Sequence, residues 1–167
     1  KIPIIVFINK LDREGKDAFD LMDEVEKKLG LQVTPLSFPI GMGYDFQGIY
    51  NIWEKNINLF SGDSRKNIED TIAISDLMSP ELNKLIGENP ANKLREELEL
   101  IEEVYPAFNK EEYLAGNLQP VFFGSALNNF GVRELLDCFV EIAPTPRAKE
   151  SDTRLVNPEE QKLSGFV

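Results

Sequence analysis

Near its start the chain reads Ile2-Pro3-Ile4-Ile5-Val6-Phe7-Ile8-Asn9-Lys10-Leu11-Asp12, an apolar run that changes abruptly into a polar loop. Continuous apolar runs bounded by polar residues are typical of strands buried in parallel sheets, which are covered on both faces. Ligands of open α/β sheets bind just beyond the carboxyl ends of such strands. The pattern therefore predicts a buried parallel strand over residues 2–8 and a ligand-binding loop directly after it.

The side chains of this loop suit the recognition of guanine. Guanine presents a ring N–H beside an amino group, and the ionised carboxylate of Asp12 can accept both as paired charge-assisted hydrogen bonds. Adenine lacks that donor pair. Lys10 can lay its aliphatic stem over the base while its ammonium stays in water, and Asn9 can hold the loop or contact the base edge. The alternative is a polar turn in which Asp12 caps the following helix.

A second strand-to-loop step occurs where Val121-Phe122-Phe123 runs into Gly124-Ser125-Ala126-Leu127. A small residue here lets the backbone N–H of Ala126 approach a carbonyl such as guanine O6, and Ser125 can bond back to the loop that carries Asp12. An ordinary strand-to-helix turn is the alternative. The predicted guanine site consists of Asn9, Lys10, Asp12, Ser125, Ala126 and Leu127. No catalytic and no metal-ligating residue is predicted.

The two loops resemble the fourth and fifth guanine-nucleotide motifs of the translational GTPases. The resemblance covers nearly the whole chain and is greatest to the release-factor branch of that superfamily. It rests on residues 7–13, 94–100, 113–116, 120–132 and 162–167. Pro39-Ile40-Gly41 and Phe46-Gln47-Gly48-Ile49 fit that branch and the branch of elongation factor G and the ribosomal-protection proteins equally well.

The resemblance implies a function. Members bind GTP and GDP with Mg²⁺, act on the ribosome in the cytoplasm and hydrolyse GTP. The release-factor branch promotes the departure of class-I release factors during translation termination. An elongation factor G or ribosomal-protection GTPase is the nearest alternative. An alternative of another class is a non-catalytic domain whose acidic surface binds a protein and which takes no nucleotide.

The phosphate-handling residues of this superfamily are not recognisable in the sequence. There is no glycine-rich loop that ends in Gly-Lys-Ser or Gly-Lys-Thr, which would cradle phosphates and supply a hydroxyl for Mg²⁺. There is also no histidine. We therefore expect a fragment that covers the second half of the GTPase domain and is inactive alone, with Mg²⁺ bound only in the intact protein.

The composition of the chain indicates which classes of partner it is suited to bind. The formal net charge is −11 at pH 7, and acidic surfaces repel phosphate backbones, so no direct RNA-binding patch is expected. Acidic runs such as Glu96-Glu97-Leu98-Glu99 are typical of a solvated helix face, with a protein-docking face as the weaker alternative. No apolar stretch is long enough to span a membrane. Cys138 is the only cysteine and is predicted to be a buried structural thiol.

Apolar spacing predicts several helices and strands. A helix follows the first loop and ends at Gly30; others begin at Ser79-Pro80 and Asn89-Pro90. Short strands are expected over residues 33–40, 46–52 and 56–60, with Tyr50 and Trp53 in the core. The apolar faces of the helices consist of Ala18, Met22, Val25 and Leu29; of Leu94, Leu98 and Ile101; and of Val132, Leu135, Leu136 and Phe139.

This order predicts an α/β fold: the C-terminal part of a doubly wound P-loop GTPase sheet, with an α+β insertion and the first strand of a following β-barrel. Residues 1–30 and 119–146 would form the guanine-reading half of the GTPase domain. Residues 31–118 would form the insertion, because a compact GTPase joins its helix to the next strand by a short loop. Residues 147–167 would be a linker and the start of the barrel.

Overall fold

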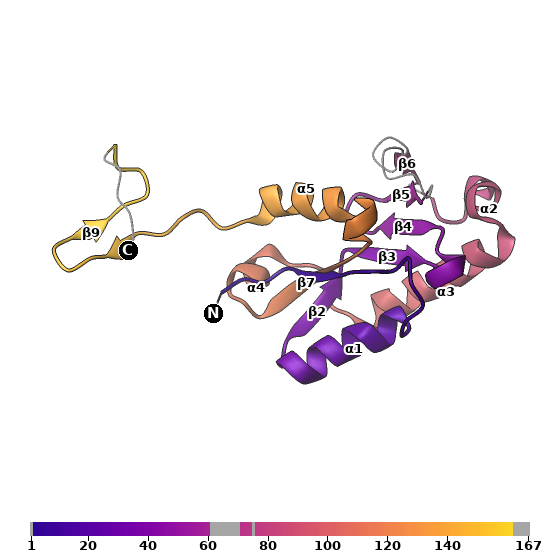
Figure 1. Cartoon of the computed structure of the whole chain (residues 1–167), viewed down its shortest axis with the longest axis horizontal. Helices are drawn as coiled ribbons and strands as arrows, with labels where there is room; N and C mark the ends of the chain where they lie inside the picture. Colours follow the sequence, from indigo (N-terminus) through magenta and orange to yellow (C-terminus); the bar gives the residue numbers. More distant parts are fainter. Residues whose placement is uncertain (1, 61–70, 75, 162–167) are drawn as a thin grey trace.

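The structure is a computed structural model that describes residues 2–60, 71–74 and 76–161 (Figure 1). Its parallel sheet has the order β1-β7-β2 and consists of β1 (Val6–Ile8), β7 (Leu118–Phe123) and β2 (Gln32–Pro35). Ile8 lies opposite Phe123, so the two strands end side by side. The strand predicted over residues 2–8 was too long, since β1 begins only at Val6 and Ile2 is 82% exposed. The residues of β1 are half-buried, because β7 is the only described strand that pairs with β1.

Two helices cover opposite faces of this sheet, α1 (Ala18–Leu29) and α5 (Val132–Ile142) (Figure 1). Successive side chains of a strand point to opposite faces, and β7 follows this rule. Phe123 packs in the same core cluster as Met22 of α1, whereas Phe122 packs in a second cluster with Cys138 of α5. The described part of the chain is therefore an α/β fold with helices on both faces of a parallel sheet.

An antiparallel sheet continues from the end of β2. It has the order β3-β4-β5-β6 and consists of β3 (Ser37–Ile40), β4 (Gly48–Asn51), β5 (Asn56–Leu59) and β6 (Thr71–Ala73). Only Leu36 separates β2 from β3. Its N–H donates to the Val121 carbonyl at 2.9 Å, and the next residue, Ser37, accepts the Phe123 N–H on its Oγ at 2.9 Å. The backbone therefore runs directly from the parallel sheet into the antiparallel sheet.

This passage corrects one sequence prediction. The single strand expected over residues 33–40 is broken at Leu36, because its first half pairs with β7 and its second half with β4. The boundary proposed at Leu31 stays a prediction. It precedes β2, and the strand pairing changes from parallel to antiparallel after Pro35. The strands predicted over residues 46–52 and 56–60 correspond to β4 and β5.

The remaining helices are α2 (Pro80–Ile86), α3 (Glu88–Val104) and α4 (Lys110–Leu114). Ser79 caps α2 as predicted, since its Oγ accepts the Glu81 N–H at 3.2 Å. The buried face of α3 consists of Ala91, Leu94, Leu98 and Ile101, which share one core cluster with Phe123 and with Ile49 of β4. A division of the chain into a GTPase part and an insertion remains a prediction.

The apolar face of α5 differs from the predicted one. Cys138 and Ile142 are buried, whereas Leu136 is 51% exposed and Phe139 is 47% exposed. The helix turns the stripe of Leu135, Cys138 and Ile142 towards β7, which leaves the neighbouring apolar stripe outside. None of the helices in the described residues combines the length and the apolar character needed to cross a membrane.

Beyond α5 an extended segment leads to a small hairpin that lies apart from the two sheets (Figure 1). Its strands are β8 (Lys149–Glu150) and β9 (Leu155–Val156). The predicted linker therefore contains regular structure. The predicted start of a β-barrel, at residues 163–167, lies outside the described residues.

Candidate functional site

The two predicted guanine loops meet at the carboxyl ends of β1 and β7. Gly124 donates its N–H to the Ile8 carbonyl at 3.0 Å, and Leu11 donates its N–H to the Gly124 carbonyl at 3.2 Å. Ala126 donates its N–H to Oδ1 of Asn9 at 2.9 Å. The structure therefore brings together segments that the sequence had linked only by their positions after two strands.

Asn9 is the side chain that joins the loops. Its Oδ1 accepts the N–H of Lys10 at 2.8 Å as well as that of Ala126. Of the two roles considered for Asn9, this geometry favours holding the loop. The Ala126 N–H, predicted to approach guanine O6, is donated to Asn9 in this structure.

Ser125 does not make the predicted bond to the loop that carries Asp12. Its Oγ accepts from Nδ2 of Asn128 at 2.8 Å, and its N–H is donated to the Phe130 carbonyl at 2.9 Å. Ser125 is buried, so these local bonds shape its own loop. The bond that links the two loops is made by the amide of Asn9 instead.

Gly124 is needed for the packing of the second loop. A Cβ added there would lie 2.3 Å from the Phe130 carbonyl oxygen and 2.8 Å from Cζ of Phe7. Both contacts are far shorter than van der Waals distance, and one of them is to backbone. The absence of a side chain at Gly124 allows the second loop to fold back against the end of β7.

Asp12 is half-exposed, and within the part of the chain that the structure describes its carboxylate makes no hydrogen bond and no ion pair. The helix cap that was the alternative role for Asp12 belongs to Asp17, whose Oδ1 accepts the Phe19 N–H at 2.9 Å. Both carboxylate oxygens of Asp12 are thus available to a pair of donors such as the edge of guanine.

Lys10 has an unusual backbone conformation, with φ at 72°. Positive φ is uncommon for residues other than glycine and costs about 1–3 kcal/mol at an isolated position. The carbonyl of Lys10 accepts the Arg13 N–H at 3.1 Å, which closes a tight turn around Asp12. The Lys10 side chain is exposed, and Leu127 on the other loop is 80% exposed.

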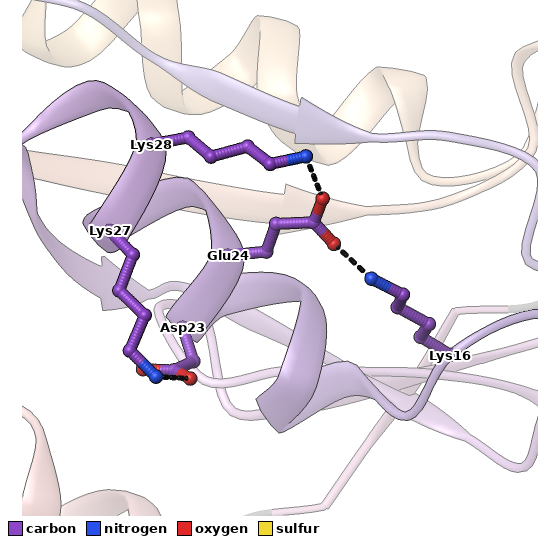
Figure 2. A network of polar contacts seen from close by, with 5 residues as sticks. All are labelled: Lys16, Asp23, Glu24, Lys27 and Lys28. Carbon is purple, nitrogen blue, oxygen red and sulfur yellow. Dashed lines mark hydrogen bonds and ion pairs between the residues drawn. The ribbon is translucent and has the colours of Figure 1, made fainter.

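Figure 2 shows how the far end of the first loop is tied to α1. Nζ of Lys16 lies 2.5 Å from Oε2 of Glu24, and Lys28 pairs with the other oxygen of the same carboxylate. Hydrogen bonds from Lys16 and Lys28, with their positive charges, lower the pKa of Glu24 to about 2. Lys27 and Asp23 form a separate pair on the same helix.

The sequence analysis missed two supports of the loops. Gly43 donates its N–H to the carbonyl of Leu11 at 3.0 Å. Phe130 is buried and packs edge-to-face against Phe46 and Phe60, with ring centroids 5.6 Å away in both cases. The glycines and aromatic residues were visible in the sequence, but no local pattern indicated that they would contact the loops.

A cavity of about 500 Å³ lies away from the guanine loops, between β2, the turn after β4 and the end of α3. Its lining includes Trp53, Tyr105 and Phe108, with one charged side chain, Glu102. Tyr50 is buried as predicted, whereas Trp53 is only half-buried because it faces this cavity.

Residues 1–145 match the model of the elongation factor Tu GTP binding domain. The chain belongs to this family. Membership implies binding of a guanine nucleotide, and the parallel sheet with helices on both faces is consistent with the P-loop GTPase fold. The chain is also 44% identical over 165 residues to peptide chain release factor 3 of Buchnera aphidicola subsp. Acyrthosiphon pisum (strain 5A). That match covers 99% of this chain and 31% of the relative.

A guanine nucleotide carries phosphates in addition to the base. Within residues 2–60, 71–74 and 76–161, no group of three or more His, Cys, Asp or Glu side chains is placed to hold a metal ion. The sequence also has no phosphate loop.

Proposed function

We propose that this chain is the guanine-reading part of a translational GTPase that promotes the departure of class-I release factors from the ribosome. The observation that carries the proposal is the bond between Asn9 and Ala126, which holds the loop of Asp12 beside that of Ser125 at the ends of two parallel strands. The 44% identity to peptide chain release factor 3 favours the release-factor branch over that of elongation factor G. The intact protein would hydrolyse GTP in the cytoplasm.

In this proposal the six loop residues determine which base is bound. Asp12 accepts the ring N–H and the amino group of guanine, and Lys10 covers the base with its stem. Asn9 holds the two loops together, while Ser125, Ala126 and Leu127 form the opposite wall. These residues would make kcat/KM specific for guanine nucleotides. Hydrolysis would depend on the groups that bind the phosphates and Mg²⁺, which would lie elsewhere in the intact protein.

The domain division extends the proposal. Residues 1–30 and 119–146 would belong to the GTPase domain, and residues 31–118 to an insertion whose first strand completes the parallel sheet. Residues 147–167 would lead into a β-barrel domain. The chain spans about a third of the length of the curated relative, with the match covering 31% of it.

The test is Asp12→Asn in the full-length protein that contains this chain. Loss of charge-assisted hydrogen bonds of about 1.5–3 kcal/mol predicts a ten- to hundredfold weaker affinity for GDP. Xanthosine diphosphate should bind the Asp12→Asn variant more tightly than it binds the wild type. The reason is that xanthine has a carbonyl in place of the amino donor, and the Asn amide can donate a hydrogen bond to that carbonyl. Both affinities are measured by calorimetry.

The matched control is Asp17→Asn, which makes the same change in the same loop. Asn caps a helix about as well as Asp, so neither nucleotide affinity should change. Unchanged GDP affinity of Asp12→Asn, with no gain for xanthosine diphosphate, would show that Asp12 does not read the base.

A further inference from the structure

The residue before Asp12 is held by two different parts of the fold. Leu11 is 2% exposed. Its N–H is donated to Gly124 at the end of β7, and its carbonyl accepts the N–H of Gly43 at 3.0 Å. Gly43 opens the short 3₁₀ helix η1 (Gly43–Asp45), which lies between β3 and β4 of the antiparallel sheet. The antiparallel sheet therefore contacts the base loop directly.

Position 43 requires a glycine. Its φ is 61°, in the left-handed region that favours glycine. A Cβ added there would lie 2.9 Å from Cγ of Glu14 and 3.2 Å from the Glu14 backbone nitrogen. Gly43 thus touches the loop on both sides of Asp12, at Leu11 and at Glu14.

The same turn also supports the second loop. Phe46 directly follows η1, and its ring packs at 89° against the ring of Phe130, with 5.6 Å between their centroids. Phe130 exchanges two backbone hydrogen bonds with Ser125, at 2.9 and 3.0 Å. Residues 43–46, between β3 and β4, therefore contact both loops.

We propose that Gly43 is a positioning residue of the guanine site, through which the antiparallel sheet holds the carboxylate of Asp12 at the correct distance from the second loop. The proposal rests on the proposed function of Asp12. A bidentate carboxylate accepts two donors only when both oxygens are placed to within a few tenths of an ångström. A shift of the loop at Leu11 would therefore weaken the bond to the guanine amino group first.

The experiment compares GDP with inosine diphosphate, which lacks the 2-amino group, in the full-length protein and its Gly43→Ala variant. Loss of one charge-assisted hydrogen bond predicts about tenfold weaker binding of GDP. Binding of inosine diphosphate should change much less, because its phosphates and its remaining base contacts are the same. The ratio of the GDP affinity to the inosine diphosphate affinity should therefore fall by nearly the same factor as the GDP affinity itself.

The control is Gly30→Ala. Gly30 has nearly the same φ, 62°, but nothing within 4 Å of an added Cβ, and it lies at the far end of α1. This variant carries the same backbone strain and should keep the wild-type preference. Equal loss of affinity for both nucleotides in Gly43→Ala, or no loss for either, would overturn the positioning role.

A measurement on the wild type covers the case in which Gly43→Ala does not fold. The Gly43 amide should exchange its hydrogen more slowly with GDP bound than with inosine diphosphate bound; equal rates would contradict the proposal. The Asp12→Asn variant separates the two hypotheses. If it gains xanthosine diphosphate binding while Gly43→Ala keeps the wild-type preference, only the role of Gly43 is wrong.

Discussion

Oδ1 of Asn9 lies 2.9 Å from the backbone nitrogen of Ala126, a residue 117 positions later in the chain. The same oxygen accepts the N–H of Lys10. One side-chain atom therefore fixes the local turn and the distance between the two loops. Its removal should disturb both.

We expect Asn9→Ala to lower the free energy of unfolding by about 1–2 kcal/mol, because two backbone N–H groups lose their acceptor. Asn9→Asp keeps an acceptor oxygen and should lose less. Urea unfolding of this chain measures both values. Equal stability of Asn9→Ala and the wild type would mean that the bond contributes nothing to holding the loops.

Gly124→Ala should destabilise the chain by about 1–3 kcal/mol or more, because the added methyl meets the Phe130 carbonyl oxygen at 2.3 Å. The control is Gly15→Ala, where the nearest atom is Sδ of Met42 at 3.7 Å. That substitution should stay within about 0.5 kcal/mol of the wild type. Similar losses for both variants in urea unfolding would contradict the close packing at Gly124.

Glu24 should titrate well below its ordinary pKa of 4.5, at about 2, in the folded chain. Because the folded value is the lower one, the stabilisation from this group is complete above the unfolded pKa and is lost as the pH falls towards 2. Lys16→Met removes the largest cause and should raise the pKa of Glu24. Carboxyl-carbon NMR shifts follow the titration.

Lys27→Met is the matched control for this titration, because Lys27 pairs with Asp23. It should change the pKa of Glu24 less than Lys16→Met does. The effect on the free energy of unfolding should be small, since exposed ion pairs contribute little. A wild-type Glu24 that titrates near 4.5 would show that the contacts of Figure 2 are not maintained in solution.

This chain alone should bind GDP or GTP in the millimolar range at best and should not hydrolyse GTP. A charged hydrogen bond contributes about 1.5–3 kcal/mol and a neutral one about 0.5–1.5 kcal/mol. Several kcal/mol are lost when a ligand is immobilised, and phosphate contacts that would outweigh this loss are not recognisable here. Calorimetry with and without Mg²⁺ measures the affinity. Micromolar binding, or phosphate release above background, would contradict the prediction.

Local signals explain what could be predicted from the sequence. The apolar run before Asn9 and the short strand before Gly124 indicated two strands that end in polar loops, and both are present. The start of α1 was also predictable, because its apolar stripe begins at Ala18. The loop contains two aspartates, Asp12 and Asp17, and the one next to that stripe is the cap.

The errors arose where the outcome depends on distant neighbours. The break at Leu36 depends on β7 and β4, which pair with successive halves of one extended run. The exposure of Phe139 depends on which stripe of α5 turns towards Phe122. The contact of Gly43 with Leu11 joins a turn of one sheet to a loop of the other, and no periodicity of the sequence indicates such a contact.

The pairing of β1 with β7 also has a consequence for the newly made chain. Asn9 is synthesised 117 residues before the partner that orders its loop. At a synthesis rate of about 5–20 residues per second, this gap lasts about 6–23 s. We expect that nascent chains halted at increasing lengths acquire protease resistance around Asn9 only once Ala126 has left the ribosomal tunnel. Resistance at shorter lengths would show that the first loop is ordered without the second.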